Sequence, residues 1–196
     1  RKKALYMGLA GVLGVALAAT LCLTGCSSVG YYWQSAVGHL HILQQARPVS
    51  EWVNGGEAPE RVRAKLELSQ RIRDFASREL KLPDNPSYRR YANLHRRAAV
   101  YNVTAAPIYS LDLKQWCFPV TGCVGYRGYY DEAAARREAA ELAQQGYEVN
   151  VYPVTAYSTL GLMNWAGGDP LLSTFILYPE GELARLIFHE LAHQVL

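Results

Sequence analysis

The most constraining feature of this chain is a pair of histidines, His189 and His193, four positions apart with Glu190 directly after the first. Four residues make about one turn of an α-helix, so both imidazoles can reach one ion if this segment is helical. Histidine pairs at this spacing are typical Zn²⁺ ligands, and the intervening glutamate can act as the general base toward an attacking water. The motif therefore predicts a zinc helix in which His189 and His193 bind the metal and Glu190 is catalytic.

The surroundings of the motif favour the same interpretation. Apart from Glu190, no charged residue lies between positions 186 and 196, and apolar residues recur at helical spacing from 183 onward. An imidazole buried there without a partner would be costly, whereas a metal ion would satisfy it. The alternative is a coincidental pair of core histidines, because so short a motif also arises by chance.

A catalytic zinc site requires three protein ligands, and the motif supplies two. In metallopeptidases with this motif the third ligand usually follows it, so we expect that ligand beyond Leu196 and interpret residues 51–196 as the N-terminal part of a longer metallopeptidase domain. Recognition of a free amino terminus would also require a carboxylate near the metal. Asp169, Glu180 and Glu182 are close in sequence, although a turn or helix-start role suits each of them better.

The N-terminal segment indicates export. Three basic residues precede an apolar run over residues 4–23, followed by Thr24, Gly25 and Cys26. This is the layout of a secretory signal, and its end resembles the lipobox of bacterial lipoproteins. By that resemblance, residues 1–25 are a signal peptide, Cys26 carries the acyl chains, palmitate among them, and Ser27 permits sorting to the outer membrane, facing the periplasm. The alternative is a plain transmembrane helix, since about twenty apolar residues can span a bilayer.

The charge distribution argues against nucleic acid as a partner. The formal net charge of +3 comes from the three basic residues at the start, and the rest of the chain carries equal numbers of basic and acidic residues. No broad electropositive field remains, so the sequence predicts peptide substrates and a membrane contact through the lipid anchor, and no nucleic-acid binding.

The two cysteines of the exported domain, Cys117 and Cys123, are expected to form a disulfide, because they are an even pair in an oxidising compartment. The alternative is a zinc pair, but their separation exceeds the usual gap of zinc knuckles. His39 and His41 are a second candidate metal pair, although their imidazoles diverge on the helix predicted there.

Periodicity and composition predict an α+β fold. Residues 26–50 indicate a tether that leads into a first helix. Helical patterns and capping residues predict further helices at residues 59–80, 87–97, 131–145 and from 179 onward. β-branched and aromatic residues predict strands at residues 100–103, 108–111, 147–155 and 174–178. We expect these helices to pack on a small mixed sheet in a zincin-like arrangement, with the zinc helix last.

Several stretches together resemble a known family. They are Tyr31–Gln34, Leu80–Pro83, Trp116–Cys123, Tyr126–Tyr129, Ala156–Gly161, Asp169–Thr174 and Phe188–Gln194. The chain resembles the zinc aminopeptidase family of proteobacterial lipoproteins, within the wider gluzincin-like group. The resemblance implies Zn²⁺ as cofactor, peptides as substrates and a further half beyond Leu196, with a glutamate ligand on a later helix.

Two other functions remain open at this point. One is an envelope lipoprotein that binds zinc or a partner without catalysis, and Glu190 argues against it because a purely structural zinc site has no use for that carboxylate. The other is a metal-dependent amidase that acts on cell-wall peptides, which the same motif would serve equally well.

Overall fold

The structure, a computed structural model, describes residues 30–118 and 122–195. The chain divides into two compact units, Arg1–Gly38 and His39–Leu196. The described part of the first unit, residues 30–38, is helical. The predicted signal peptide and Cys26 lie outside the described residues. Among those that are described, no helix combines the length and the apolarity of a membrane span.

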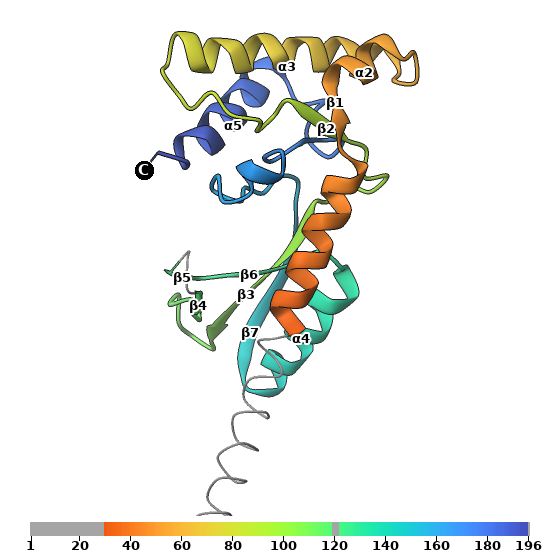
Figure 1. The fold of residues 1–196 in the computed structure, drawn as a ribbon. Coiled ribbons are helices and arrows are strands. Elements are labelled where there is room, and N and C mark those ends of the chain that lie inside the picture. Colours follow the sequence, from red (N-terminus) through yellow and green to blue (C-terminus); the bar gives the residue numbers. More distant parts are fainter. Residues whose placement is uncertain (1–29, 119–121, 196) are drawn as a thin grey trace, which may run out of the picture. The chain divides into compact units, whose positions relative to one another are not determined.

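One part of the second unit, called here the α5 region, is built from short strands and three helices. Its elements are β1 (Arg47–Pro48), α2 (Val49–Asn54), α3 (Glu60–Arg78), β2 (Arg90–Ala92), β8 (Leu171–Leu172) and α5 (Glu180–Ala192). The sheet has the order β1-β2-β8, and it is mixed because β2 pairs antiparallel with β1 and parallel with β8. Helix α3 packs against both α2 and α5 (Figure 1).

The core of the α5 region lies where the two long helices meet the sheet. Helix α3 follows Pro59 and buries one face, on which the fully buried residues recur three or four positions apart, as an amphipathic helix requires. Helix α5 buries a stripe spaced four residues apart. Together with β2 and β8 these faces contribute the buried side chains Leu66, Ala76, Tyr91, Ala92, Leu171, Leu172, Leu183, Ile187 and Leu191.

The α4 region is the other part of the second unit. It consists of β3 (Val100–Pro107), β6 (Arg127–Tyr129), α4 (Glu132–Gln144) and β7 (Tyr147–Val154). The sheet order is β6-β3-β7, and both pairings are antiparallel, with β3 and β7 in register along all 8 residues of each strand. Helix α4 packs against β3 and β7 (Figure 1).

Local sequence signals explain both ends of α4. Asp131 is the N-cap, and its carboxylate accepts a hydrogen bond from the Ala134 amide at 2.8 Å. Gly146 follows the helix with a φ of 86°, the left-handed conformation that glycine adopts without a steric penalty. The helix predicted at residues 131–145 is therefore confirmed, as is the strand at 147–155.

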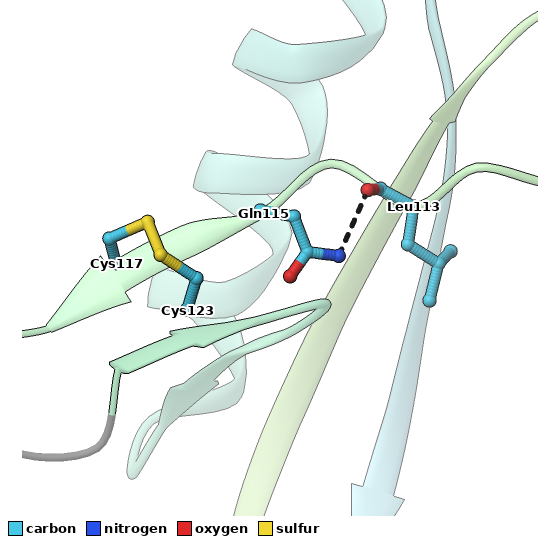
Figure 2. Close-up of a disulfide and its surroundings, with 4 residues drawn as sticks. All are labelled: Leu113, Gln115, Cys117 and Cys123. Carbon is cyan, nitrogen blue, oxygen red and sulfur yellow. Dashed lines mark hydrogen bonds between the residues drawn. A yellow bond between two sulfur atoms is a disulfide. The ribbon is translucent and has the colours of Figure 1, made fainter.

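A small hairpin is formed by β4 (Trp116–Phe118) and β5 (Gly122–Val124). Cys117 lies directly opposite Cys123 in this pairing, and a disulfide joins their sulfur atoms (Figure 2). Just before β4, the side-chain amide of Gln115 donates a hydrogen bond to the Leu113 carbonyl at 3.2 Å, which is also drawn in Figure 2. The cysteine pair is thus fixed by local strand pairing.

The fold is mixed α+β, as predicted, but the described residues form several small sheets rather than one. Three segment predictions were wrong. Residues 87–97 contain β2 and turns instead of a helix, because the segment pairs with two strands that are distant in sequence. Residues 108–111 form a turn and a loop after β3, and residues 174–178 form turns.

Candidate active site

Helix α5 presents the histidine motif on its exposed side. Leu183, Ile187 and Leu191 are each 0% exposed and form the buried stripe of the helix. His189 lies two positions after Ile187, which on a helix is a rotation of about 200°. His189 and His193 are therefore turned away from the core, and both are exposed. Burial of the apolar stripe alone is enough to direct the two imidazoles outward.

The two imidazoles lie close together. The Nε2 atoms of His189 and His193 are 3.1 Å apart, and the ring planes meet edge-on with centroids 4.5 Å apart. Two imidazole nitrogens that bind one tetrahedral zinc at about 2.0–2.1 Å would lie roughly 3.3–3.4 Å apart. The spacing of these nitrogens therefore fits a shared metal ion with little rearrangement.

Glu190 lies on the same helix but is partly buried. Burial is the largest influence on its carboxyl group and raises its pKa above the ordinary value of 4.5. The two histidines lower this pKa, the Asp169 carboxylate raises it, and a hydrogen bond from Ser158 lowers it. Glu190 is thus a partly buried carboxyl group with polar neighbours. It is next to His189 in the chain and can accept or donate a proton there.

Asp169 is 1% exposed and is held by the turn that precedes it in the chain. Its carboxylate accepts hydrogen bonds from the Ser158 hydroxyl at 3.2 Å and from the amide and hydroxyl of Thr159, each at 2.9 Å. Because these donors occupy the carboxylate, Asp169 organises a turn. This is the role that the sequence favoured over recognition of a substrate amino terminus. Glu180 and Glu182 belong to the first turn of α5, about two turns before His189, and therefore do not flank the imidazoles.

Tyr88 contributes a buried hydroxyl to the surroundings of Glu190. The side chain is 1% exposed, and its Oη is shielded from solvent. Burial raises the pKa of this phenol, the Asp169 and Glu190 carboxylates raise it further, and a hydrogen bond with Ser158 lowers it. Sequence reasoning did not select Tyr88 or Ser158 as site residues, because both reach Glu190 only through the tertiary fold.

The other candidate metal ligands do not gather into a site. The described residues contain no group of three or more histidine, cysteine or acidic side chains that could hold a metal ion. His39 is buried and shares a hydrogen bond of 2.8 Å with the Tyr157 hydroxyl, whereas His41 is exposed and contacts Gln45. A third ligand beyond Leu196 stays a prediction.

These observations define the class of the chain, a mixed α+β protein with an exposed His-Glu-x-x-His helix. The family model Aminopep, whose description is "Putative aminopeptidase", matches residues 30–196. The chain belongs to this family. No curated protein and no solved structure matches it. The resemblance inferred from the sequence is thereby confirmed at the level of an aminopeptidase family.

Proposed function

We propose that this protein is a zinc-dependent peptidase with a zincin-like site, acting as an aminopeptidase. The observation that supports the proposal most directly is the pair of exposed imidazole nitrogens of His189 and His193, 3.1 Å apart with Glu190 beside them. The family description independently favours hydrolysis of peptides from the amino end.

His189 and His193 would hold the metal through Nε2, and the third protein ligand would come from a residue beyond the described ones. When bound, zinc supplies Lewis-acid polarisation of the scissile carbonyl and lowers the pKa of the attacking water. The imidazole is a favoured ligand for this ion, and neither ring has to leave the exposed face of α5 to reach it.

Glu190 would carry the proton transfers. Its carboxylate takes the proton from the attacking water and later delivers it to the nitrogen of the leaving amine, so that one group serves as base and then as acid. Ser158 lies close enough to hydrogen-bond this carboxylate whenever its single hydroxyl proton is not donated to Asp169.

Substitutions in the full-length protein separate metal binding from catalysis. His189→Ala and His193→Ala each remove a ligand and should lose both zinc and peptidase activity. Glu190→Gln keeps the size of the side chain, so zinc should stay near stoichiometric while kcat falls by about 10²–10⁴-fold. Glu182→Gln, on the exposed first turn of the same helix, is the matched control and should leave both unchanged.

The outcomes distinguish the functions that the motif allows. Full peptidase activity in Glu190→Gln would show that the proposed mechanism is wrong. Hydrolysis of peptidoglycan fragments in place of amino-acid anilides would instead identify a cell-wall amidase. Stoichiometric zinc with no hydrolysis of either substrate would identify a zinc-binding protein without catalysis.

We also propose that the protein is anchored in the cell envelope through acylation of Cys26, facing the periplasm from the outer membrane. The support is the lipobox-like end of the signal segment, which lies outside the described residues. Two or three acyl chains suffice for stable anchoring. Cys26→Ser should abolish palmitate labelling and either release the protein from membranes or block its processing. Unchanged labelling would exclude lipidation at this residue.

A further inference from the structure

The residue that follows the second histidine connects three segments of the fold. The Oε1 atom of Gln194 accepts hydrogen bonds from Nδ2 of Asn85 at 2.6 Å and from Nδ2 of Asn164 at 3.5 Å. Its Nε2 donates to the Ser87 hydroxyl at 3.4 Å. The side chains of Asn85, Ser87, Asn164 and Gln194 are called the Gln194 clamp below. They come from the loop before β2, from η1 (Asn164–Ala166) and from the end of α5.

The Ser87 hydroxyl at the centre of the clamp has its hydrogen-bonding capacity filled. It donates to Oδ1 of Asn164 at 3.1 Å and accepts from Gln194 and from the Asp169 amide, the latter at 3.2 Å. A hydroxyl has one donor and two acceptor positions, and all three are used. Gly168 allows this close approach, since a Cβ there would lie 2.6 Å from the Ser87 hydroxyl. The clamp is therefore a specific network.

The loop that carries Asn85 and Ser87 is held by a buried cation. Arg73, on α3, is 0% exposed. Its guanidinium donates to the backbone carbonyls of Pro83, Ser87 and Asn85 at 2.6, 3.0 and 3.1 Å. Oδ1 of Asn85 also accepts from the Ser87 amide at 3.0 Å. Gln194 thus binds a loop whose backbone is fixed from within the core.

The second imidazole needs such support because it lies where the helix ends. Helix α5 runs to Ala192, and His193 is its C-cap, with an amide that still bonds to the His189 carbonyl at 3.2 Å. Terminal turns of helices lack part of their hydrogen bonding and fray readily. His189 lies in the last turn of α5, whereas His193 is already the C-cap and depends on what holds the next residue.

We propose that the Gln194 clamp positions His193, so that the two imidazoles stay at the separation a shared metal ion requires. Gln194 is then a positioning residue, with Asn85, Ser87 and Asn164 as its fixed partners. The inference rests on the proposed zinc site, and it adds residues outside the motif on which metal affinity depends. Partners outside the ligand set commonly alter metal affinity by about 10–100-fold.

The test uses the full-length protein and measures Zn²⁺ affinity by competition with a chromophoric chelator. Gln194→Met keeps the length of the side chain and removes its hydrogen bonds, so Zn²⁺ should bind about tenfold more weakly. Asn85→Ala removes the shortest of the three Gln194 hydrogen bonds and should also weaken Zn²⁺ binding, and the double variant should lose little more than Gln194→Met, because that variant already lacks this bond. Val195→Ala, at a neighbouring position that is 61% exposed, is the control and should bind Zn²⁺ as the wild type does.

A second measurement needs no metal. Amide hydrogen exchange at residues 191–195 should become faster in Gln194→Met, while the first turns of α5 and their exchange rates stay unchanged. Should Gln194→Met fail to fold, Asn85→Ala gives both readouts.

Each outcome bears on one of the two proposals. Wild-type Zn²⁺ affinity in both single variants overturns the role of the clamp and leaves the proposed function standing. A loss of affinity matched by faster exchange throughout the second unit shows general destabilisation and overturns the role as well. If the wild-type protein binds no Zn²⁺, or if the His189→Ala variant binds Zn²⁺ as tightly as the wild type does, the proposed zinc site is overturned and the inference with it.

Discussion

The α5 region and the α4 region differ in how they use polar side chains. In the α5 region and its flanking loops, the buried polar residues include Ser69, Arg73, Ser87 and Asp169, each no more than 1% exposed. In the α4 region the buried polar side chain is Asn102, at 9%. The α4 region instead relies on regular backbone pairing between β3 and β7 and on a helix that is capped within its own first turn.

This difference in buried polar side chains affects which region can hold the side chains of a functional site in fixed positions. Buried polar groups are stable only when each finds its hydrogen-bond partner, so they fix segments from distant parts of the chain in one arrangement. The motif on α5 is surrounded by such groups, whereas regular pairing in the α4 region tolerates change at individual positions. We therefore expect substitutions of matched type to cost more in the α5 region, and the following predictions test that contrast.

The largest effect is expected for Arg73→Met, which keeps the apolar stem and removes the guanidinium. Backbone carbonyls of Pro83, Asn85 and Ser87 would lose their donor inside the protein. We expect the free energy of unfolding to fall by about 3–5 kcal/mol, measured by urea denaturation. A loss below about 1 kcal/mol would show that apolar packing alone holds this loop, and the contrast between the regions would disappear.

The next prediction concerns pH. His39 is 6% exposed, and burial lowers its pKa below the ordinary 6.5, with partial opposition from Asp169. The unfolded chain therefore binds a proton at a pH where the folded chain does not. The stabilising contribution is complete above about pH 6.5 and is lost as the pH falls below it, by at most about 1.4 kcal/mol per pH unit. Unfolding free energies between pH 5 and 7 should show a shallower slope in His39→Gln, and an equal slope would contradict the prediction.

A smaller effect is expected for Asp131→Ala in the α4 region. The substitution removes the side-chain acceptor for the Ala134 amide at the start of α4. Loss of an N-cap costs about 1 kcal/mol in the free energy of unfolding. Asp131→Asn retains the cap and serves as the control. A loss as large as that of Arg73→Met would mean that the α4 region depends on single polar contacts as strongly as the α5 region does.

The smallest effect is expected for Arg136→Ala. Arg136 pairs with Glu132 one turn earlier on α4 at 2.6 Å, but the two side chains are 67% and 45% exposed. Exposed ion pairs of this kind contribute about 0.3–0.5 kcal/mol and are weakened by salt. Denaturation at low and high ionic strength should show a difference within that range at low salt only. A larger, salt-independent loss would point to packing by the arginine stem.

The amino-acid sequence by itself determined the elements whose signals are local. Helices α3, α4 and α5 and strand β7 follow from periodicity and capping within a single segment. The same holds for the histidine pair, because four residues on any helix bring two side chains to one face. The exposure of His189 and His193 also follows from the apolar stripe of their own helix.

The tertiary structure decided what depends on distant partners. Residues 90–92 are strand because they pair with Arg47–Pro48 and Leu171–Leu172, although their own composition predicted a helix. Residues 108–111 have strand-like composition, yet Pro107 ends β3 and Tyr109 takes a φ of 66°, so no pairing follows. Residues 174–178 form turns in which Phe175 and Ile176 are buried, and a short apolar stretch does not reveal from the sequence alone whether it will be strand or turn.

The candidate site also has one part that the local sequence determines and another part that the tertiary structure determines. The histidine pair and Glu190 belong to one segment, and their spacing is written in five consecutive residues. The partners of Gln194 and the Ser158 hydroxyl near Glu190 come from other segments, and each is brought in by a hydrogen bond that only the folded backbone can align. Hydrogen bonds between side chains leave no periodic pattern along the chain, so the surroundings of the motif were decided by the fold.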